Sequence, residues 1–355
     1  MSNYLSLAET IVELEQGNPP AINAGFLGAR LDPAEASLLL IPVPWEATTS
    51  YGGGTAEAPL AIRSASHQLD LEDGAFGTPY KAGIAFIEQS GEIAELNRSA
   101  REQALRVIEA MERFEEAPEE TAIVNAASEK LNDYVYREAR AIRAQGKLAA
   151  LVGGDHACPQ GLIQALAEEG EFGILHFDAH HDLRVAYEGF THSHASIFYN
   201  VLESYPTVTR LVQVAIRDYS RDEAQYARAQ GERVAVHYGR DLFRRKAEGE
   251  SFQAITQSII GQLPPRVYIS FDIDALDPPY CPSTGTPVPG GISFDEASYM
   301  LEELALSGKE IIGFDLCEVA PGEDEWDANV GARLLYKLCG ALIYSQGKCG
   351  RQHRQ

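Results

Sequence analysis

The segment Phe172-Gly-Ile-Leu-His-Phe-Asp-Ala-His-His-Asp182 joins a short apolar run to a cluster of ionisable side chains. Its first six residues have the composition of a buried strand. If the chain stays extended after them, Asp178, His180 and Asp182 point to one side, whereas His181 points away. Carboxylates and an imidazole at the end of an apolar strand are unfavourable unless their charge is compensated. We therefore expect a divalent metal ion beside this segment.

Two further apolar runs end in the same way. Residues 266–271 are followed by Asp272 and Asp274, which share one face of an extended chain. Residues 148–152 are followed by two glycines, an aspartate and then His156. Three such motifs in one chain are a far more specific indication of a metal centre than one acidic loop.

Strand-like and helix-like segments alternate along most of the chain, which indicates a parallel sheet covered on both faces. We expect a three-layer α/β/α sandwich with a mostly parallel central sheet. The predicted strands are residues 37–43, 81–86, 148–152, 172–177, 211–216, 233–237, 266–271 and 310–316, and the predicted helices are residues 6–14, 57–66, 99–114, 126–145, 159–167, 221–230, 239–246, 251–262, 294–306 and 328–342.

Ligand sites in such sheets lie beyond the carboxyl ends of the strands. The acidic and histidine clusters all follow predicted strands, so we expect them to meet at one rim. The residues expected there are His156, Asp178, His180, Asp182, Asp272, Asp274 and Glu318.

The 355 residues can bury a large core as one domain or as two. No internal repeat, low-complexity segment or linker divides the sequence. We expect a peripheral segment over residues 1–36, a single α/β/α domain over residues 37–345 and a polar tail over residues 346–355.

The net charge is −23, from 52 acidic and 29 basic residues. Such an excess argues against a nucleic-acid partner, whose phosphates would be repelled. The acidic surface either steers a cationic substrate or serves solubility. No apolar run is long enough to span a bilayer, and the first residues lack the pattern of a signal peptide. We expect a cytoplasmic protein without a membrane partner.

Five cysteines are scattered along the chain without a C-x-x-C spacing. An odd number in a long chain argues against a disulfide framework. We expect buried free thiols at Cys158, Cys281, Cys317, Cys339 and Cys349.

Four aspartates and two histidines are more donors than one zinc ion takes. They suit two hard or borderline cations that share carboxylates, with manganese as the first choice by ligand type and iron, nickel or cobalt as alternatives. Two such cations convert a water molecule into a nucleophile for an sp² carbon or a phosphorus. A phosphatase would need cationic side chains around the phosphate, and the predicted rim is acidic. We therefore favour attack on carbon.

Gly153-Gly-Asp-His156, Asp178-Ala-His-His-Asp182 and Ser270-Phe-Asp-Ile-Asp-Ala-Leu-Asp-Pro278 resemble the three signatures of the ureohydrolase family of arginases, agmatinases, guanidinobutyrases and formiminoglutamases. Tyr51-Gly-Gly-Gly-Thr55 and residues 284–291 and 314–321 support the resemblance, which extends from about residue 38 to residue 342.

The resemblance implies a role for each matching position. One metal ion would be held by His156, Asp178, Asp182 and Asp272, and the other by Asp178, His180, Asp272 and Asp274, so that Asp178 and Asp272 bridge. Glu318 matches the carboxylate that pairs with the guanidinium of the substrate, and His194 matches the histidine that passes a proton to the leaving amine. The products would be urea and an amine, and the family implies a homotrimer or a homohexamer.

The substrate is less constrained. Residues 183–191 do not match the Asn/Thr/Ser-rich segment with which arginases hold the amino-acid end, which disfavours L-arginine. Arg184 stands there instead and could bind a substrate carboxylate; formiminoglutamases carry an arginine at a similar place. Alternatively, Arg184 pairs with Glu188 or Glu46. The triple glycine and residues 284–291 look like the agmatinase–arginase branch.

We rank agmatinase-like guanidino hydrolysis first, before a formiminoglutamase and a guanidino-acid or guanidine hydrolase. A non-catalytic partner subunit would have lost metal ligands, and none is lost here. His192 is a candidate for contact with the substrate, although its presence near the motif could be fortuitous. Tyr187, Phe190 and Trp45 could close the pocket on a small substrate.

Several ionisable residues near the motifs are expected to serve the structure. We expect His176 to be a core histidine with satisfied hydrogen bonds and His181 to point off the metal face. Asp155 and Asp277 would accept backbone hydrogen bonds at turns, and Asp315 would likewise be structural.

Overall fold

The computed structural model describes residues 4–17, 19–20 and 24–348. Its centre is one sheet in the order β2-β1-β3-β8-β7-β4-β5-β6. Every strand pair is parallel, which confirms the predicted sheet. The strands are β1 (Leu38–Pro42), β2 (Ile84–Phe86), β3 (Leu148–Val152), β4 (Phe172–Phe177), β5 (Val208–Ile216), β6 (Val234–Tyr238), β7 (Arg266–Asp272) and β8 (Glu310–Cys317).

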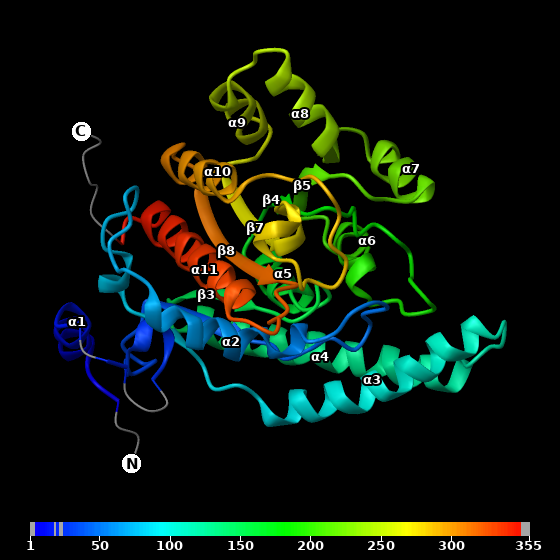
Figure 1. Cartoon of the computed structure of the whole chain (residues 1–355), viewed down its shortest axis with the longest axis horizontal. Coiled ribbons are helices and arrows are strands. Elements are labelled where there is room, and N and C mark those ends of the chain that lie inside the picture. Colours follow the sequence, from blue (N-terminus) through cyan, green and yellow to red (C-terminus); the bar gives the residue numbers. More distant parts are fainter. Residues whose placement is uncertain (1–3, 18, 21–23, 349–355) are drawn as a thin grey trace.

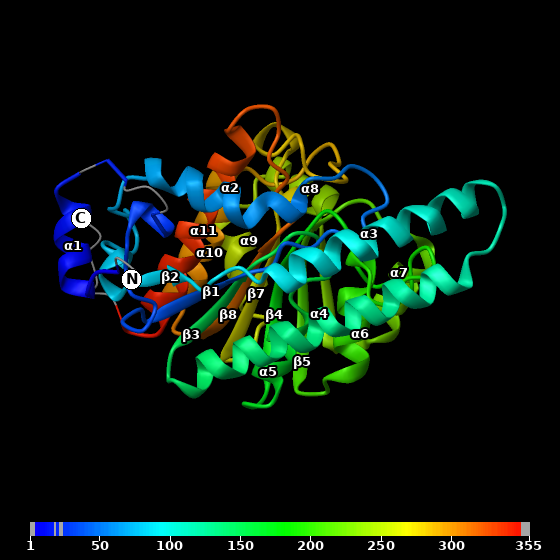
Figure 2. The ribbon, with the colours of Figure 1, turned by 90° about the horizontal axis from the view of Figure 1, so that it is seen from below.

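Helices cover both faces of the sheet (Figures 1 and 2). Residues of α2, α8, α9, α10 and α11 pack into one apolar core, and residues of α3 to α7 pack into a second core on the opposite face. The helices are α1 (Leu7–Glu15), α2 (Ala58–Ala65), α3 (Gly91–Glu112), α4 (Pro118–Ala144), α5 (Gln160–Ala167), α6 (Ile197–Ser204), α7 (Arg221–Ala229), α8 (Gly239–Ala247), α9 (Phe252–Ile260), α10 (Phe294–Leu306) and α11 (Trp326–Ser345).

The two cores follow from the geometry of a strand, in which successive side chains point to opposite faces. In β1, Leu38 and Leu40 belong to the first core, whereas Leu39 and Ile41 belong to the second. Both faces of the strand are therefore buried, which is why the sequence reads as an unbroken apolar run. The predicted three-layer α/β/α sandwich is confirmed; the division into a segment, a domain and a tail stays a prediction.

The order of the strands in the sheet brings the segments with the predicted metal motifs together. Strands β1 to β3 build one side of the sheet and β4 to β6 build the other, and β7 and β8 then fill the gap between β3 and β4. The four neighbouring strands β3, β8, β7 and β4 consequently end beside one another at one rim. These are the strands that carry the predicted metal motifs and Glu318.

Some element boundaries differ from the prediction. Helix α3 begins before the predicted residue 99 because the Ser90 hydroxyl caps it by accepting the N–H of Ile93 at 3.3 Å. Helix α4 begins before the predicted residue 126, with Pro118 at its first position and Glu119 and Glu120 in its first turn. Both features favour a helix start, because proline lacks an N–H to satisfy and acidic groups complement the helix dipole. Helix α6 was not predicted at all.

Two expectations about composition can be compared with the structure. Cys158, Cys281, Cys317 and Cys339 are buried free thiols, as expected, and Cys349 lies outside the described residues. Among the residues that the structure describes, no helix is both long and apolar enough to cross a membrane.

Helices α3 and α4 form an antiparallel hairpin whose tip projects beyond the rest of the molecule in Figure 2. Phe114 lies two residues beyond the end of α3 at this tip, with φ of +59° and a side chain that is 99% exposed. The N–H of Glu115 reaches back to the carbonyl of Ala110 at 2.9 Å, a bond that glycine at position 114 would form without strain. The left-handed backbone of Phe114 therefore costs conformational free energy, and the exposed ring makes no buried contact that would offset it.

We predict that Phe114→Gly raises the free energy of unfolding by about 1 kcal/mol, because glycine removes the left-handed strain and no buried contact is lost. Urea denaturation followed by circular dichroism measures the change. Phe114→Ala is the matched control, since alanine removes the exposed ring but keeps the strain. Equal stabilisation by both variants would show that the ring, rather than the backbone, is responsible.

Candidate active site

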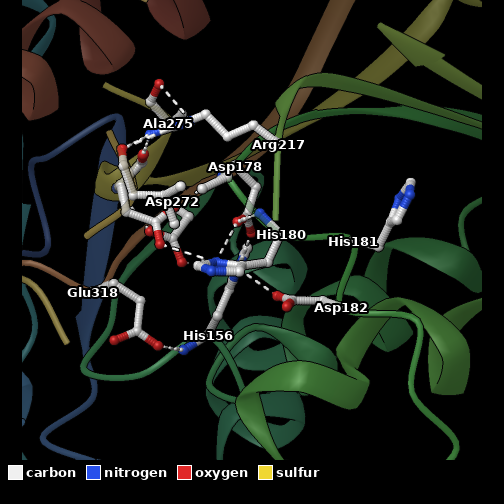
Figure 3. A network of polar contacts seen from close by, with 12 residues as sticks. His156, Asp178, His180, His181, Asp182, Arg217, Asp272, Ala275 and Glu318 are labelled. Atoms are coloured by element: carbon white, nitrogen blue, oxygen red, sulfur yellow. Dashed lines mark hydrogen bonds and ion pairs between the residues drawn. The ribbon is translucent and has the colours of Figure 1, made fainter. Parts of the chain in front are cut away.

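The site begins with His156, which follows β3 and turns one ring nitrogen toward three carboxylates (Figure 3). Its Nδ1 atom lies 3.1 Å from Oδ2 of Asp178, 3.0 Å from Oδ2 of Asp182 and 3.4 Å from Oδ2 of Asp272. These residues come from β3, β4 and β7 and the loops after them. Segments more than a hundred residues apart in sequence thus meet around one imidazole.

A second group of donors lies beside the first. The Nδ1 atom of His180 is 3.0 Å from Oδ2 of Asp274 and 3.4 Å from Oδ1 of Asp178. Asp178 therefore faces both imidazoles, one with each of its oxygens. The six residues predicted as metal ligands all lie in this cluster. Two groups of donors have the spacing to hold a metal ion, and they are His156, His176, Asp178 and Asp182, and Asp178, His180 and Asp274.

The four aspartates of the cluster give it an excess of negative charge when no metal ion is bound. Burial and the charges of Asp274 and Asp178 raise the pKa of Asp272 well above its ordinary value, and burial together with Asp178 raises the pKa of Asp182 to about 7. Oxygen-rich donors with two imidazoles are the ligands that hard and borderline divalent cations prefer. The residues present therefore fit such cations, which would compensate the buried negative charge.

The loop after β4 is not the extended chain that the alternating spacing assumed. Strand β4 ends at Phe177, and Asp182 has a φ of +54°. The N–H of His180 donates to Oδ1 of Asp178 at 2.5 Å, which curls the segment around that carboxylate. The three side chains converge because of this loop. The structure therefore brings the predicted residues together, but not through the extended chain from which they were predicted.

Two glycines let the loop after β3 pass between its neighbours. A Cβ atom on Gly154 would lie 1.8 Å from the carbonyl oxygen of Trp45, and one on Gly153 would lie 2.6 Å from the sulfur of Cys317. Any other residue at either position would push His156 away from the carboxylates. Trp45 itself is fully buried and does not line the pocket, which corrects the expectation that it closes over a substrate.

The far side of His156 is held by a buried network. Its Nε2 atom lies 2.9 Å from the hydroxyl of Ser270, which donates to Asp315 at 2.7 Å. The hydroxyl of Tyr268 donates to the same carboxylate at 2.7 Å. With Ser270 accepting from Nε2–H, the lone pair of Nδ1 points at the cluster. Asp315 is thus structural, as expected.

Glu318 lines, together with four of the candidate metal ligands, a pocket of about 510 Å³. Its Oε1 atom accepts the backbone N–H of His156 at 2.8 Å. Burial and the neighbouring Asp155 raise the pKa of Glu318 well above its ordinary value. Its backbone is left-handed, with φ of +63°, a strained conformation that proteins retain mainly at functional positions. The second oxygen is left for a ligand with positive charge.

His194 lines the same pocket and has an unusual environment. Burial, followed by the nearby His180 and His156, lowers the pKa of His194 to about 4. Its Nδ1 atom lies 3.3 Å from the hydroxyl of Thr48, which in turn donates to Asp155 at 3.2 Å. Because that hydroxyl hydrogen points to Asp155, the oxygen accepts from Nδ1–H and leaves Nε2 as the basic nitrogen. Asp155 also accepts the N–H of Ala157, as a turn residue was expected to do.

Arg184 lines the pocket, but its partner is not one that was predicted. Its Nε atom is 3.5 Å from Oε2 of Glu223, and its guanidinium lies 4.9 Å from the centre of the Tyr187 ring. Neither Glu188 nor Glu46 pairs with it. Glu46 instead accepts the N–H of Gly54 at 2.6 Å and so closes the triple-glycine loop at the mouth of the pocket.

Two predicted pocket residues lie elsewhere. The Nδ1 atom of His192 is 3.1 Å from Oε1 of Gln160, and the residue does not line the pocket. Phe190 is fully buried in a separate apolar cluster with Val107 and Val124. We therefore assign neither of them a contact with the substrate. His181 points away from the cluster in Figure 3, as expected.

Arg217 is a residue of the site that the sequence analysis missed. Its guanidinium donates to backbone carbonyls only, and no ion pair joins it to a carboxylate within the described residues. It donates to the carbonyls of Asp274 at 2.6 Å, Leu276 at 3.2 Å and Val288 at 2.9 Å, besides that of Ala215 at 3.1 Å. Figure 3 shows Arg217 beside Ala275, whose carbonyl lies 3.5 Å from the guanidinium. Arg217 directly follows β5, so the rule that sites lie at the ends of parallel strands already pointed to it.

Comparisons with known proteins agree with this geometry. A family model described as "Arginase family" matches residues 36–340. The N(1)-aminopropylagmatine ureohydrolase of Thermus thermophilus is 35% identical over 327 residues, which is 90% of this chain and 94% of that protein. The guanidinopropionase of Pseudomonas aeruginosa is 29% identical over 91% of this chain and 92% of that protein. The solved proclavaminate amidino hydrolase of Streptomyces clavuligerus shares the fold, with a TM-score of 0.69, 23% identity and coverage of 92% of this chain and 99% of that one.

We predict that Arg217→Lys lowers the free energy of unfolding by about 2 kcal/mol, because one ammonium group cannot reach carbonyls on three separate segments. Urea denaturation measures the loss. Arg221→Lys, at the exposed start of α7, is the matched control and should change little. If both variants were equally stable, the carbonyl contacts of Arg217 would be irrelevant to stability.

Proposed function

The chain belongs to the arginase family, and from this premise we propose that it is an agmatinase-like ureohydrolase that releases urea and an amine from a guanidino substrate. The single observation that carries the proposal is the cluster of six candidate metal donors, joined by contacts of 3.0 to 3.4 Å, beside the pocket that Glu318 lines. A non-catalytic partner subunit is the alternative from another class. It is disfavoured because no donor of the set has been replaced.

The proposed metal ligands are His156, Asp178, Asp182 and Asp272 for one cation and Asp178, His180, Asp272 and Asp274 for the other. Manganese is our proposal for both, with nickel, cobalt or iron as alternatives, because carboxylate-rich sites with imidazoles suit these ions. When bound, the two cations would acidify a water molecule so that it becomes a nucleophile at neutral pH.

The chain's own residues would bind and orient the substrate. Glu318 is buried at the pocket wall, and its side chain keeps one oxygen free of the backbone bond to His156. A guanidinium offers parallel N–H groups that match a carboxylate, and such charge-assisted bonds are strong where water is excluded. Pairing would also offset the cost of the buried carboxylate, so we propose that Glu318 fixes the guanidino carbon beside the donor cluster.

His194 would move the proton that the reaction requires. Its lowered pKa keeps the ring neutral at neutral pH, and Thr48 holds the hydrogen on Nδ1. We propose that Nε2 accepts a proton released by the attacking water and gives it to the nitrogen of the tail. The bond between that nitrogen and the guanidino carbon then breaks, the oxygen of water remains in urea, and the tail leaves as an amine.

The tail of the substrate would lie against the outer wall of the pocket, which includes Ser50, Tyr51, Tyr187, Asp218, Tyr219 and Val288. The name of the Thermus relative points to an amine-bearing guanidino substrate, and the exposed carboxylate of Asp218 suits a cationic tail. Agmatine-like compounds are therefore our first proposal.

A guanidino acid is the second candidate. Arg184 lines the pocket, and its terminal nitrogens have no hydrogen-bond or ion-pair partner among the described residues. Glu223 holds its Nε atom, and the ring of Tyr187 packs against the guanidinium. A preordered guanidinium of this kind binds a carboxylate in two-pronged fashion. The name of the Pseudomonas relative agrees with such a substrate. A formiminoglutamase, guanidine as substrate, assembly as a homotrimer or homohexamer, and a cytoplasmic location remain further proposals.

We predict that Asp178→Asn loses bound manganese and activity together, whereas Glu318→Gln keeps the metal and loses about 100- to 1,000-fold in kcat/KM, because only a charged partner stabilises the buried guanidinium. Metal analysis of the purified protein and a urea-release assay give the two readouts. Full activity after exhaustive chelation, or an active Asp178→Asn variant without metal, would contradict the proposal.

The substrate class is tested by the same assay over agmatine, 4-guanidinobutyrate, arginine, guanidine and formiminoglutamate, with formamide measured in parallel for the last. For an amine-tailed substrate, we predict that Arg184→Met changes KM by no more than a few-fold. For a carboxylate-tailed substrate, the variant should raise KM about 10- to 100-fold without an equal loss of kcat, because a charge-assisted pair is removed from the ground state. The first result on agmatine together with no turnover of 4-guanidinobutyrate would exclude the guanidino acid.

A further inference from the structure

We infer that Gln213 fixes the proton of His176 so that His176 orients the shared carboxylate of Asp178 and is not itself a metal ligand. The inference rests on the proposed function, because it concerns the same metal site. By distance alone, His176 competes for the role of ligand: its ring belongs, with His156, Asp178 and Asp182, to one set of donor atoms that lie within 4.8 Å of one another.

The first step is the orientation of the Gln213 amide. Strands β4 and β5 are neighbours, and their register places His176 beside Gln213, whose side chain is fully buried. The Nε2 atom of Gln213 donates to the backbone carbonyl of His181 at 2.8 Å. A carbonyl only accepts, so the atom facing it must be the amide nitrogen and the other must be the oxygen. That oxygen then accepts from Nδ1 of His181 at 2.6 Å.

The second step follows for His176. The same amide nitrogen of Gln213 lies 2.9 Å from Nδ1 of His176. An amide nitrogen only donates, so Nδ1 must accept, and the ring hydrogen of the neutral imidazole lies on Nε2. This Nε2 atom is 2.8 Å from Oδ2 of Asp178, to which it donates. Both ring nitrogens are thus engaged, and neither has a lone pair to offer a cation.

This tautomer of His176 fixes the orientation of Asp178, which faces both His156 and His180. Its Oδ2 atom accepts from His176, and its Oδ1 atom accepts the backbone N–H of His180 at 2.5 Å. One donor on each oxygen fixes the rotation of the carboxylate before any ion arrives. The His176 ring is itself held by the ring of Phe198, whose centre is 4.1 Å away. Residues that orient ligands in this way commonly change metal affinity 10- to 100-fold when they are lost.

The test compares two substitutions of His176 by equilibrium dialysis of the full-length protein against manganese. His176→Gln places an amide N–H where Nε2–H stood and an amide oxygen toward Gln213, so we expect affinity within about threefold of the unaltered protein. His176→Leu removes the donor, and we expect a 10- to 100-fold loss. His237→Gln is the matched control, because His237 on β6 also bonds a glutamine amide, that of Gln262 at 3.1 Å, but lies outside the site.

The protein loaded with cobalt gives an independent readout. If His176 is no ligand, the visible absorption bands of His176→Gln keep the energies and intensities of the unaltered protein. Equal loss of manganese affinity in the Gln and Leu variants, with a cobalt spectrum that reports one nitrogen ligand fewer, would overturn the inference. Nitrogen-15 NMR of histidine-labelled, unaltered protein reads the tautomer directly, and a hydrogen on Nδ1 of His176 would equally overturn it.

These readouts separate the inference from the proposed function. Metal affinity, cobalt absorption and the tautomer do not depend on any substrate. If no guanidino or formimino compound is hydrolysed but the His176 series behaves as expected, the proposed function fails and the inference stands. If urea is released but the two variants lose metal equally, the reverse holds.

Discussion

The buried negative charge at one rim of the sheet is the constraint on which the rest of this structure depends. The ends of three parallel strands bring Asp178, Asp182, Asp272 and Asp274 around two imidazoles. Such a set is unfavourable in isolation, because each buried carboxylate raises the cost of ionising the next. Bound cations would remove this cost, because carboxylate oxygens that repel one another would then be attracted to the same positive ions. Occupation by metal and formation of the native rim should therefore favour each other.

Many of the polar residues around the rim hold the candidate metal ligands in place and do not themselves face the pocket. Behind His156, a buried chain of Ser270, Asp315 and Tyr268 keeps one ring nitrogen facing inward. Behind Asp178, the ring of His176 on β4 plays the corresponding part and is held by Gln213 on the neighbouring strand β5. Ligands on loops would otherwise sample many rotamers, and the entropy of fixing them would weaken binding. Placing the supporting groups on strands of the sheet, rather than on the loops, removes most of that cost before an ion arrives.

The sequence was sufficient for the sheet and for the identity of the clustered residues, because both follow from short-range rules. Apolar runs ending in ionisable groups located β3, β4 and β7, and the parallel sheet required those ends to meet. It was insufficient wherever a side chain chooses between distant partners. Arg184 meets Glu223 rather than a nearer glutamate, and Phe190 turns into the α3–α4 core, because loop backbone conformation decides these contacts. The left-handed φ of Asp182 likewise has no signature in residue spacing.

Arg217 connects the candidate metal site to the wall of the substrate pocket. One guanidinium grips the backbone at Asp274, on the metal side, and at Val288, on the wall along which a substrate tail would lie. Any displacement of one segment must be transmitted to the other or break these bonds. The pocket wall at Val288 and the candidate metal site at Asp274 are therefore coupled. We expect the segment around Val288 to be more mobile in the metal-free protein than in the metal-bound protein.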